Sequence, residues 1–222
     1  MSLPALSIDA LLLQRWPATA LGCLFYEVTV TPVCQELWTY YRDTLAPELA
    51  AALAEKALTD LPGISEARSA FKAFGMDPGR WRVSSEALYR RVRQGKELYQ
   101  INSVVDANNV LSLETGFSLG SYDCARIRGD IVLRLGAEGE SYQGLGKGAI
   151  PLHNMPLLSD AEGPFGSPVS DSGRACITEA TRMVCTVLYG FSDKGALEAA
   201  LEKAADALPR FAGARNLETR LV

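Results

Sequence analysis

Residues 183–189, which read MVCTVLY, form a continuous apolar run near the C-terminal end of the chain. A short run without charged residues is typical of a strand in the middle of a sheet, where both faces are covered. No segment of the sequence approaches the apolar length that a membrane-spanning helix requires. We therefore expect residues 183–189 to form a central strand of a soluble protein.

Strand and helix signals are mixed along the rest of the chain. The sequence CLFYEVTV at 23–30 predicts a strand, and the alternation at 130–135 predicts another. Between 136 and 173, short apolar runs separated by glycine and proline predict several short strands joined by turns. Helical patterns are expected at 44–58, at 66–74, from Ser84 or Ser85 onward, at 104–113, and at about 193–208 behind an N-cap at Ser192. No clear linker interrupts them, so we expect an α+β fold with a single domain over residues 1–222.

The histidine and cysteine content excludes several classes of site. The 222 residues include one histidine, His153, which lies between two prolines, and five cysteines. A single imidazole excludes zincin-type sites and histidine-rich metal clusters. The cysteines are odd in number and widely spaced, without a CxxC pair, so we expect reduced thiols. The first residues also lack the pattern of a signal peptide, which favours a cytoplasmic protein. We expect no metal and no cofactor.

Charge is distributed unevenly along the chain. The 22 basic and 26 acidic residues give a formal net charge of −4, which argues against a general nucleic-acid coat. Residues 66–97 nevertheless carry eight basic and four acidic side chains, a local charge of +4. The aromatic residues Trp81, Tyr89 and Tyr99 lie within or directly after this segment. This composition suits a phosphate backbone with unstacked bases, although a solvated helix face would share it. The predicted RNA-binding residues are Arg82, Arg90, Arg91, Arg93 and Lys96.

Two further segments contain polar residues of interest. Asn108 and Asn109 are consecutive in VVDANNVLSLE, where asparagine competes for the backbone hydrogen bonds of a helix. Their amides could orient a substrate or a water, and they could equally cap a helix or fix a turn. Arg174 follows an Asp-Ser-Gly sequence typical of a turn, and its guanidinium could contact a phosphate or a ligand carboxylate.

Several segments, in this order, resemble a known family. They are AFGMDP at 73–78, SEAL at 85–88, YQINSVVDANN at 99–109, the segment 116–123, and GDIVLR at 129–134. Over residues 66–191 the chain is similar to the tRNA-binding and editing domain of the phenylalanyl-tRNA synthetase beta chain, and to stand-alone proteins built from that domain. The resemblance implies a mixed β-sandwich core flanked by helices. It also implies hydrolysis of tRNA for phenylalanine that has been wrongly charged with tyrosine.

The resemblance also assigns site residues. Asn108 and Asn109 correspond to a Thr-Asn pair of the family, Gly120 to a pocket histidine, and Val187 to a pocket glutamate. An aminoacyl ester is labile, so a site has only to hold the ester, position a water and stabilise an oxyanion. The predicted catalytic residues are Asn108, Asn109 and Ser121, and the predicted substrate-binding residues are Gly120, Tyr122, Arg174 and Val187.

Two functions remain open from the sequence. The first is a free-standing editing factor that hydrolyses mischarged tRNA in trans, with the tRNA lying over the basic segment. The alternative is a non-catalytic module that binds tRNA, another RNA or a small ligand on the same fold. A concave pocket at Asn109 and Ser121 would favour the hydrolase, whereas a pocket filled by Tyr122 or Phe117 would favour the alternative. Neither function involves DNA or a membrane.

Overall fold

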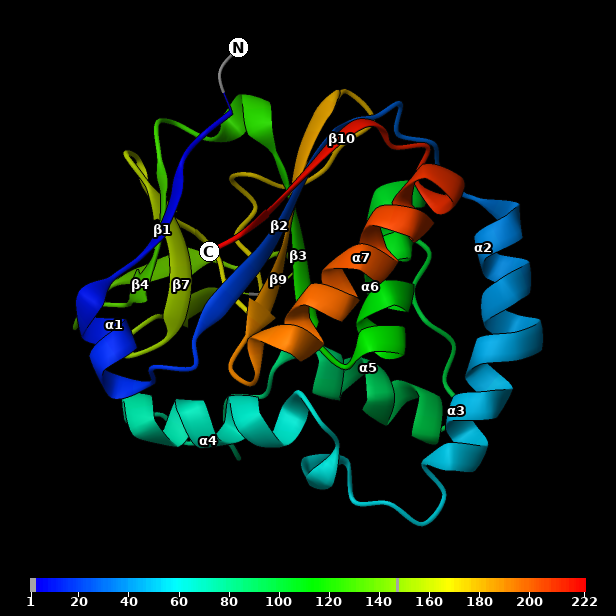
Figure 1. Cartoon of the computed structure of the whole chain (residues 1–222), viewed down its shortest axis with the longest axis horizontal. Coiled ribbons are helices and arrows are strands. Elements are labelled where there is room, and N and C mark those ends of the chain that lie inside the picture. Colours follow the sequence, from blue (N-terminus) through cyan, green and yellow to red (C-terminus); the bar gives the residue numbers. More distant parts are fainter. Residues whose placement is uncertain (1–2, 147) are drawn as a thin grey trace.

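Two four-stranded sheets form the β part of the structure. The computed structural model describes residues 3–146 and 148–222. The first sheet has the order β1-β4-β7-β8 and the second β10-β2-β9-β3 (Figure 1). The strands of the first sheet are β1 (Leu6–Ile8), β4 (Ile131–Leu135), β7 (Pro156–Asp160) and β8 (Gly163–Gly166). Those of the second are β10 (Arg215–Leu221), β2 (Ala20–Glu27), β9 (Met183–Gly190) and β3 (Ser118–Asp123).

The predicted α+β class is confirmed, and the strand pairing is mixed. β1 pairs parallel with β4, while the other pairs of these sheets are antiparallel. Tyr122 on β3 meets Phe165 on β8 edge-on, with 5.0 Å between the ring centroids, so the two sheets contact each other. A small hairpin of β5 (Ser141–Gln143) and β6 (Ala149–Pro151) completes the short strands predicted between 136 and 173.

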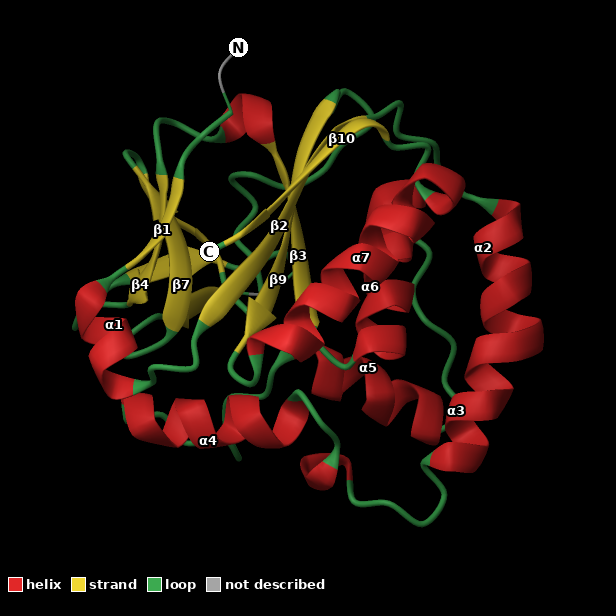
Figure 2. Cartoon of the chain, viewed as in Figure 1, coloured by secondary structure: helices red, strands yellow, loops and turns green. Residues whose placement is uncertain are grey.

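The apolar run at 183–189 lies where the sequence predicted it, in the middle of a sheet. β9 pairs with β2 on one side and β3 on the other. Val184, Cys185, Val187 and Leu188 have no exposed surface. Helices α6 (Ser103–Thr115) and α7 (Lys194–Phe211) cover one face of this sheet. Figure 2 shows the strands gathered in one half of the molecule and most helices in the other.

Helix boundaries follow local capping. The side chain of Asn102 accepts hydrogen bonds from the backbone of Val104 and Val105, at 3.1 and 3.0 Å, and so starts α6. Gly116 ends α6 in the left-handed conformation.

The remaining α-helices are α1 (Ala10–Arg15), α2 (Gln35–Tyr40), α3 (Ala46–Ala52), α4 (Ile64–Phe74) and α5 (Ser84–Arg93).

The structure differs from the sequence prediction at several elements. The helix expected at 44–58 begins at Gln35 and ends at Ala52, with a π-helical stretch at Tyr41–Leu45. Its earlier start buries Trp38, whose Nε1 donates to Asp106 at 3.0 Å, a non-local contact. Asp193, not Ser192, occupies the N-cap of α7. Strand β10 was not predicted, because its polar sequence RNLETRL lies at the edge of the sheet, largely exposed.

Candidate functional site

Asn108 and Ser121 belong to a hydrogen-bond network between α6 and the second sheet. The Asn108 Nδ2 donates to the carbonyl of Leu119 at 3.2 Å, and the Ser121 hydroxyl donates to Asn108 Oδ1 at 3.0 Å. The Ser121 and Thr186 hydroxyls are 2.8 Å apart, and the hydroxyls of Thr186 and Tyr26 are 3.0 Å apart. Asn108 is buried and its amide is engaged at both ends, so these contacts hold α6 against the sheet.

Tyr122 fills the space on the other face of the same strand. Its hydroxyl donates to Asp171 Oδ1 at 2.8 Å and lies 2.7 Å from the hydroxyl of Tyr189. A Cβ built on Gly120 would lie 2.1 Å from the Tyr122 oxygen, and one built on Gly166 would lie 2.2 Å from it. The phenol is therefore enclosed by two glycine backbones, and burial raises its pKa well above the usual value.

The sheet separates the predicted site residues into two groups. Successive side chains of a strand point to opposite faces, so Ser121 faces α6 while Gly120 and Tyr122 face the first sheet. Val187 on β9 is the direct cross-strand partner of Gly120 and is fully buried. Asn109 is half-buried on α6. The roles assigned to these residues stay predictions, and the arrangement places them around no common cleft among those described below.

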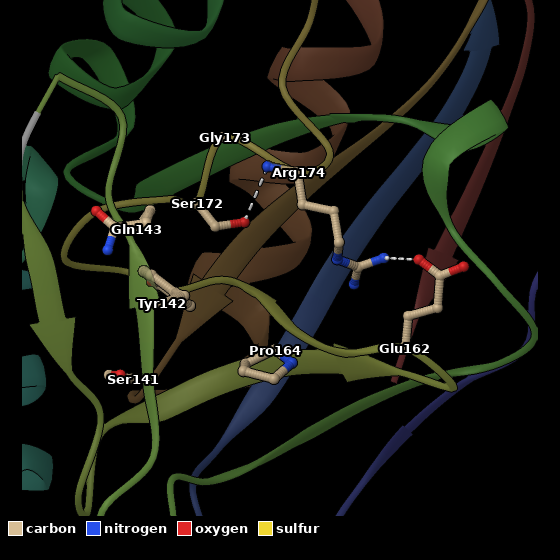
Figure 3. A pocket seen from close by; sticks show the side chains of 8 residues that line it. All are labelled: Ser141, Tyr142, Gln143, Glu162, Pro164, Ser172, Gly173 and Arg174. Carbon is tan, nitrogen blue, oxygen red and sulfur yellow. Dashed lines mark hydrogen bonds and ion pairs between the residues drawn. The ribbon is translucent and has the colours of Figure 1, made fainter.

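Arg174 does line a cleft. The cleft has a volume of about 400 Å³ and lies between β5, the start of β8 and the loop after β8 (Figure 3). Figure 3 shows Arg174 and Glu162 on one side, with Tyr142 and Gln143 on the other. The remaining lining residues are Ser141, Pro164, Ser172 and Gly173.

The guanidinium of Arg174 is held by acidic neighbours. It contacts Asp160 at 2.8 and 3.1 Å and Glu162 at 3.4 Å. Burial raises the pKa of Asp160, but hydrogen bonds from Arg174 and from the backbone of Arg128 and Glu162 outweigh it, so the pKa is lowered. Among the described residues, the buried Nε of Arg174 has no hydrogen-bond partner. Its charge is thus matched within the protein, while one donor remains unused.

A second cleft, of about 470 Å³, was not anticipated from the sequence. It lies at the N-termini of α4 and α7 and is lined by the rings of Trp16, Phe117 and Phe191 together with Glu66 and Asp193. Its residues come from distant parts of the chain, so no local pattern marks them.

The basic segment is organised around one buried carboxylate. Glu86 of α5 is fully buried and lies 3.1 Å from Arg68, 3.0 Å from Arg90 and 3.8 Å from Arg82. The three arginines are partly exposed, from 23 to 46%. One negative charge therefore anchors three positive charges at the surface, and a local excess of positive charge remains. Sequence reasoning missed this role of Glu86, although its spacing of four residues from Arg82 and Arg90 was a signal.

The end of α5 continues this surface into the following loop. Arg91 donates to the carbonyl of Glu97 at 2.6 and 3.1 Å, and its guanidinium lies 4.1 Å from the ring centroid of Tyr99. Arg93 and Lys96 are exposed, and neither side chain forms a hydrogen bond or ion pair with the described part of the chain. We call Arg82, Arg90, Arg91, Arg93 and Lys96 the α5 basic surface.

The sequence pattern of the B3/4 domain matches residues 66–213. The chain therefore belongs to the B3/4 domain family, and its predicted resemblance to the phenylalanyl-tRNA synthetase beta chain is confirmed.

One similar solved structure is an N-terminal fragment of the phenylalanyl-tRNA synthetase beta-subunit from Pyrococcus horikoshii, with 16% sequence identity and a TM-score of 0.47. The match covers 97% of this chain and 50% of that one, so this chain spans about half the length of its solved relative. No curated protein matches the sequence.

All five cysteines are free thiols. No helix in the described residues is long and apolar enough to cross a membrane. Within residues 3–146 and 148–222, no group of three or more His, Cys, Asp or Glu side chains could hold a metal ion.

Proposed function

We propose that this chain is a non-catalytic RNA-binding module, with tRNA as its partner and the α5 basic surface as the contact. The observation that carries the proposal is the buried Glu86 carboxylate shared by Arg68, Arg82 and Arg90. Three guanidinium groups around one carboxylate leave a net positive charge at the surface, where they can contact phosphates. Arg93 and Lys96 add charges that are not neutralised within the described residues.

The environment of Gly120 supports binding rather than hydrolysis. The resemblance places a histidine and a glutamate of the family at Gly120 and Val187, which are cross-strand partners here. Neither glycine nor valine has a group that can accept or donate a proton in catalysis, and the phenol of Tyr122 occupies the space beside Gly120.

We also propose that the chain acts in the cytoplasm, where charged tRNA is found and free cysteines remain reduced.

Replacing Arg93 and Lys96 together by alanine is expected to weaken tRNA binding. Each lost phosphate contact should reduce the magnitude of the slope of log K against log salt by roughly 0.7–0.9. The slope measured for the double variant should therefore be smaller in magnitude by about 1.5. Fluorescence anisotropy of labelled tRNA from 50 to 300 mM salt measures both quantities. Arg215→Ala is the matched control, since this exposed arginine lies on β10. Unchanged affinity and slope in the double variant would contradict the proposal.

A second candidate function is deacylation of mischarged tRNA in trans. The favouring observation is the cleft of about 400 Å³, because Arg174 and the hydroxyls of Ser141 and Ser172 line it. We expect a panel of aminoacyl-tRNAs to lose their esters no faster with the protein than in buffer. Acceleration with any member, abolished by Arg174→Ala in a chain that still melts cooperatively, would replace binding by editing as the function.

A further inference from the structure

Tyr99 is a large aromatic side chain that the fold leaves in solvent. It is 67% exposed, and Ile101, two residues further, is 56% exposed. This exposure is unusual within the protein, because the described part of the chain buries most of its aromatic rings. A solvent-exposed ring beside basic residues is a feature of surfaces that bind unpaired bases.

The ring is held in a fixed position. The guanidinium of Arg91 lies over it at 4.1 Å, and Nη1 donates to the Tyr99 hydroxyl at 3.2 Å. Arg91 is itself fixed by two hydrogen bonds to the carbonyl of Glu97, while the Glu97 carboxylate pairs with Arg42 at 3.5 Å. One face of the ring is thus backed by a cation, and the exposed fraction of the side chain leaves surface for a partner.

Charge selects the kind of partner. The backbone N–H of Lys96 donates to the carbonyl of Arg91 at 2.9 Å, which places the loop that carries Lys96 beside the Arg91–Tyr99 pair. Arg93 is on the last turn of the same helix. A ring backed by a guanidinium, with one further cation on the same helical turn and another in the adjoining loop, suits a base with its adjoining phosphates. A double helix presents no free base faces, so the partner is single-stranded.

We propose that Tyr99 is a stacking platform for an unpaired base of a single-stranded RNA segment, with Arg91 fixing the ring and Arg93 and Lys96 binding the neighbouring phosphates. This inference rests on the proposed RNA binding and specifies its chemistry: base stacking without base-edge recognition. Binding should therefore tolerate any base at the stacked position, because every base presents a π-face.

The test uses the full chain and a short single-stranded RNA that carries 2-aminopurine, whose fluorescence reports stacking. Tyr99→Ala should weaken binding at least about fivefold and abolish the fluorescence change, because stacking one base contributes roughly 1–3 kcal/mol. Tyr99→Phe keeps the ring and should bind within about twofold of the parent chain. An oligonucleotide with an abasic site in place of the 2-aminopurine should bind the parent chain and Tyr99→Ala equally.

The outcomes separate this inference from the proposed function. If Tyr99→Ala binds like the parent chain while the Arg93 and Lys96 variant does not, RNA binding stands and the stacking role is overturned. If the parent chain binds neither this RNA nor tRNA, both are overturned. Binding of a polyglutamate peptide that depends on Tyr99, without RNA binding, would identify a protein-docking surface instead. Thermal melting of each variant verifies folding, which an exposed side chain should not affect.

Discussion

Alanine at Gly120 is expected to lower the free energy of unfolding by about 3 kcal/mol, at the upper end of the cost of overpacking a core. The added Cβ would lie 2.1 Å from the hydroxyl oxygen of Tyr122 and 2.6 Å from Cζ, far inside van der Waals contact. The phenol cannot move aside easily, because Asp171 and Tyr189 hold its hydroxyl and Phe165 packs against its ring. Urea denaturation of the variant and the parent chain measures the difference.

A double-mutant cycle tests the cause of this effect. Tyr122→Ala alone should lower stability by about 3–5 kcal/mol, because a buried aromatic ring is removed. In the Tyr122→Ala background, however, Gly120→Ala should cost little, giving a coupling energy of about 2–3 kcal/mol. Gly166→Ala should behave like Gly120→Ala, because its Cβ would lie 2.2 Å from the same oxygen.

The matched control is Gly173→Ala, whose Cβ meets nothing within 4 Å and which should change stability by less than about 0.5 kcal/mol. If Gly120→Ala is as stable as the parent chain, the phenol does not occupy this space in solution. The cycle also bears on function. A histidine at position 120 would meet the same phenol, so the family's residue cannot be restored by a single substitution while Tyr122 remains.

The elements predicted best are those whose signal is local. The apolar run of β9, the alternation of β4 and the glycine- and proline-bounded short strands each follow from neighbouring residues. The polar edge strand β10 lacks such a signal. It is held by pairing with β2, almost two hundred residues away in sequence, as in the Leu221–Gly22 register pair. Its existence therefore depends on the sheet already being formed.

The candidate site was only partly predictable for a related reason. Neighbouring strand residues face opposite ways, so the separation of Gly120 from Ser121 follows from the β pattern once 118–123 is known to be a strand. The filling of the space beside Gly120 does not follow, because it needs Gly166 and Asp171 from another part of the chain. The basic segment was recognised by its composition, whereas its anchoring by a buried glutamate requires Arg68, eighteen residues before Glu86.

Glutamine at Glu86 is expected to lower stability by about 2–3 kcal/mol without weakening RNA binding. Removing one partner of a buried ion pair costs roughly 3–5 kcal/mol, and we expect less here because the arginines are partly solvated. The amide keeps the size of the carboxylate but turns two donors toward guanidinium groups that are donors as well. Urea denaturation measures the loss. Glu97→Gln, an exposed carboxylate paired with Arg42, is the control and should change stability by less than about 0.5 kcal/mol.

The affinity of Glu86→Gln for RNA should stay the same or rise, although its stability falls. Glu86→Gln removes the negative charge beneath three arginines, so tRNA should bind at least as tightly as to the parent chain at a temperature where both are folded. Arg90→Ala should instead lose both stability and affinity, because the same guanidinium contacts Glu86 and faces the solvent. Stability and affinity that fall together in Glu86→Gln would mean that tRNA binding depends on the anchored geometry of the arginines more than on their charge. Unchanged stability would contradict the role of Glu86 as the anchor of the α5 basic surface.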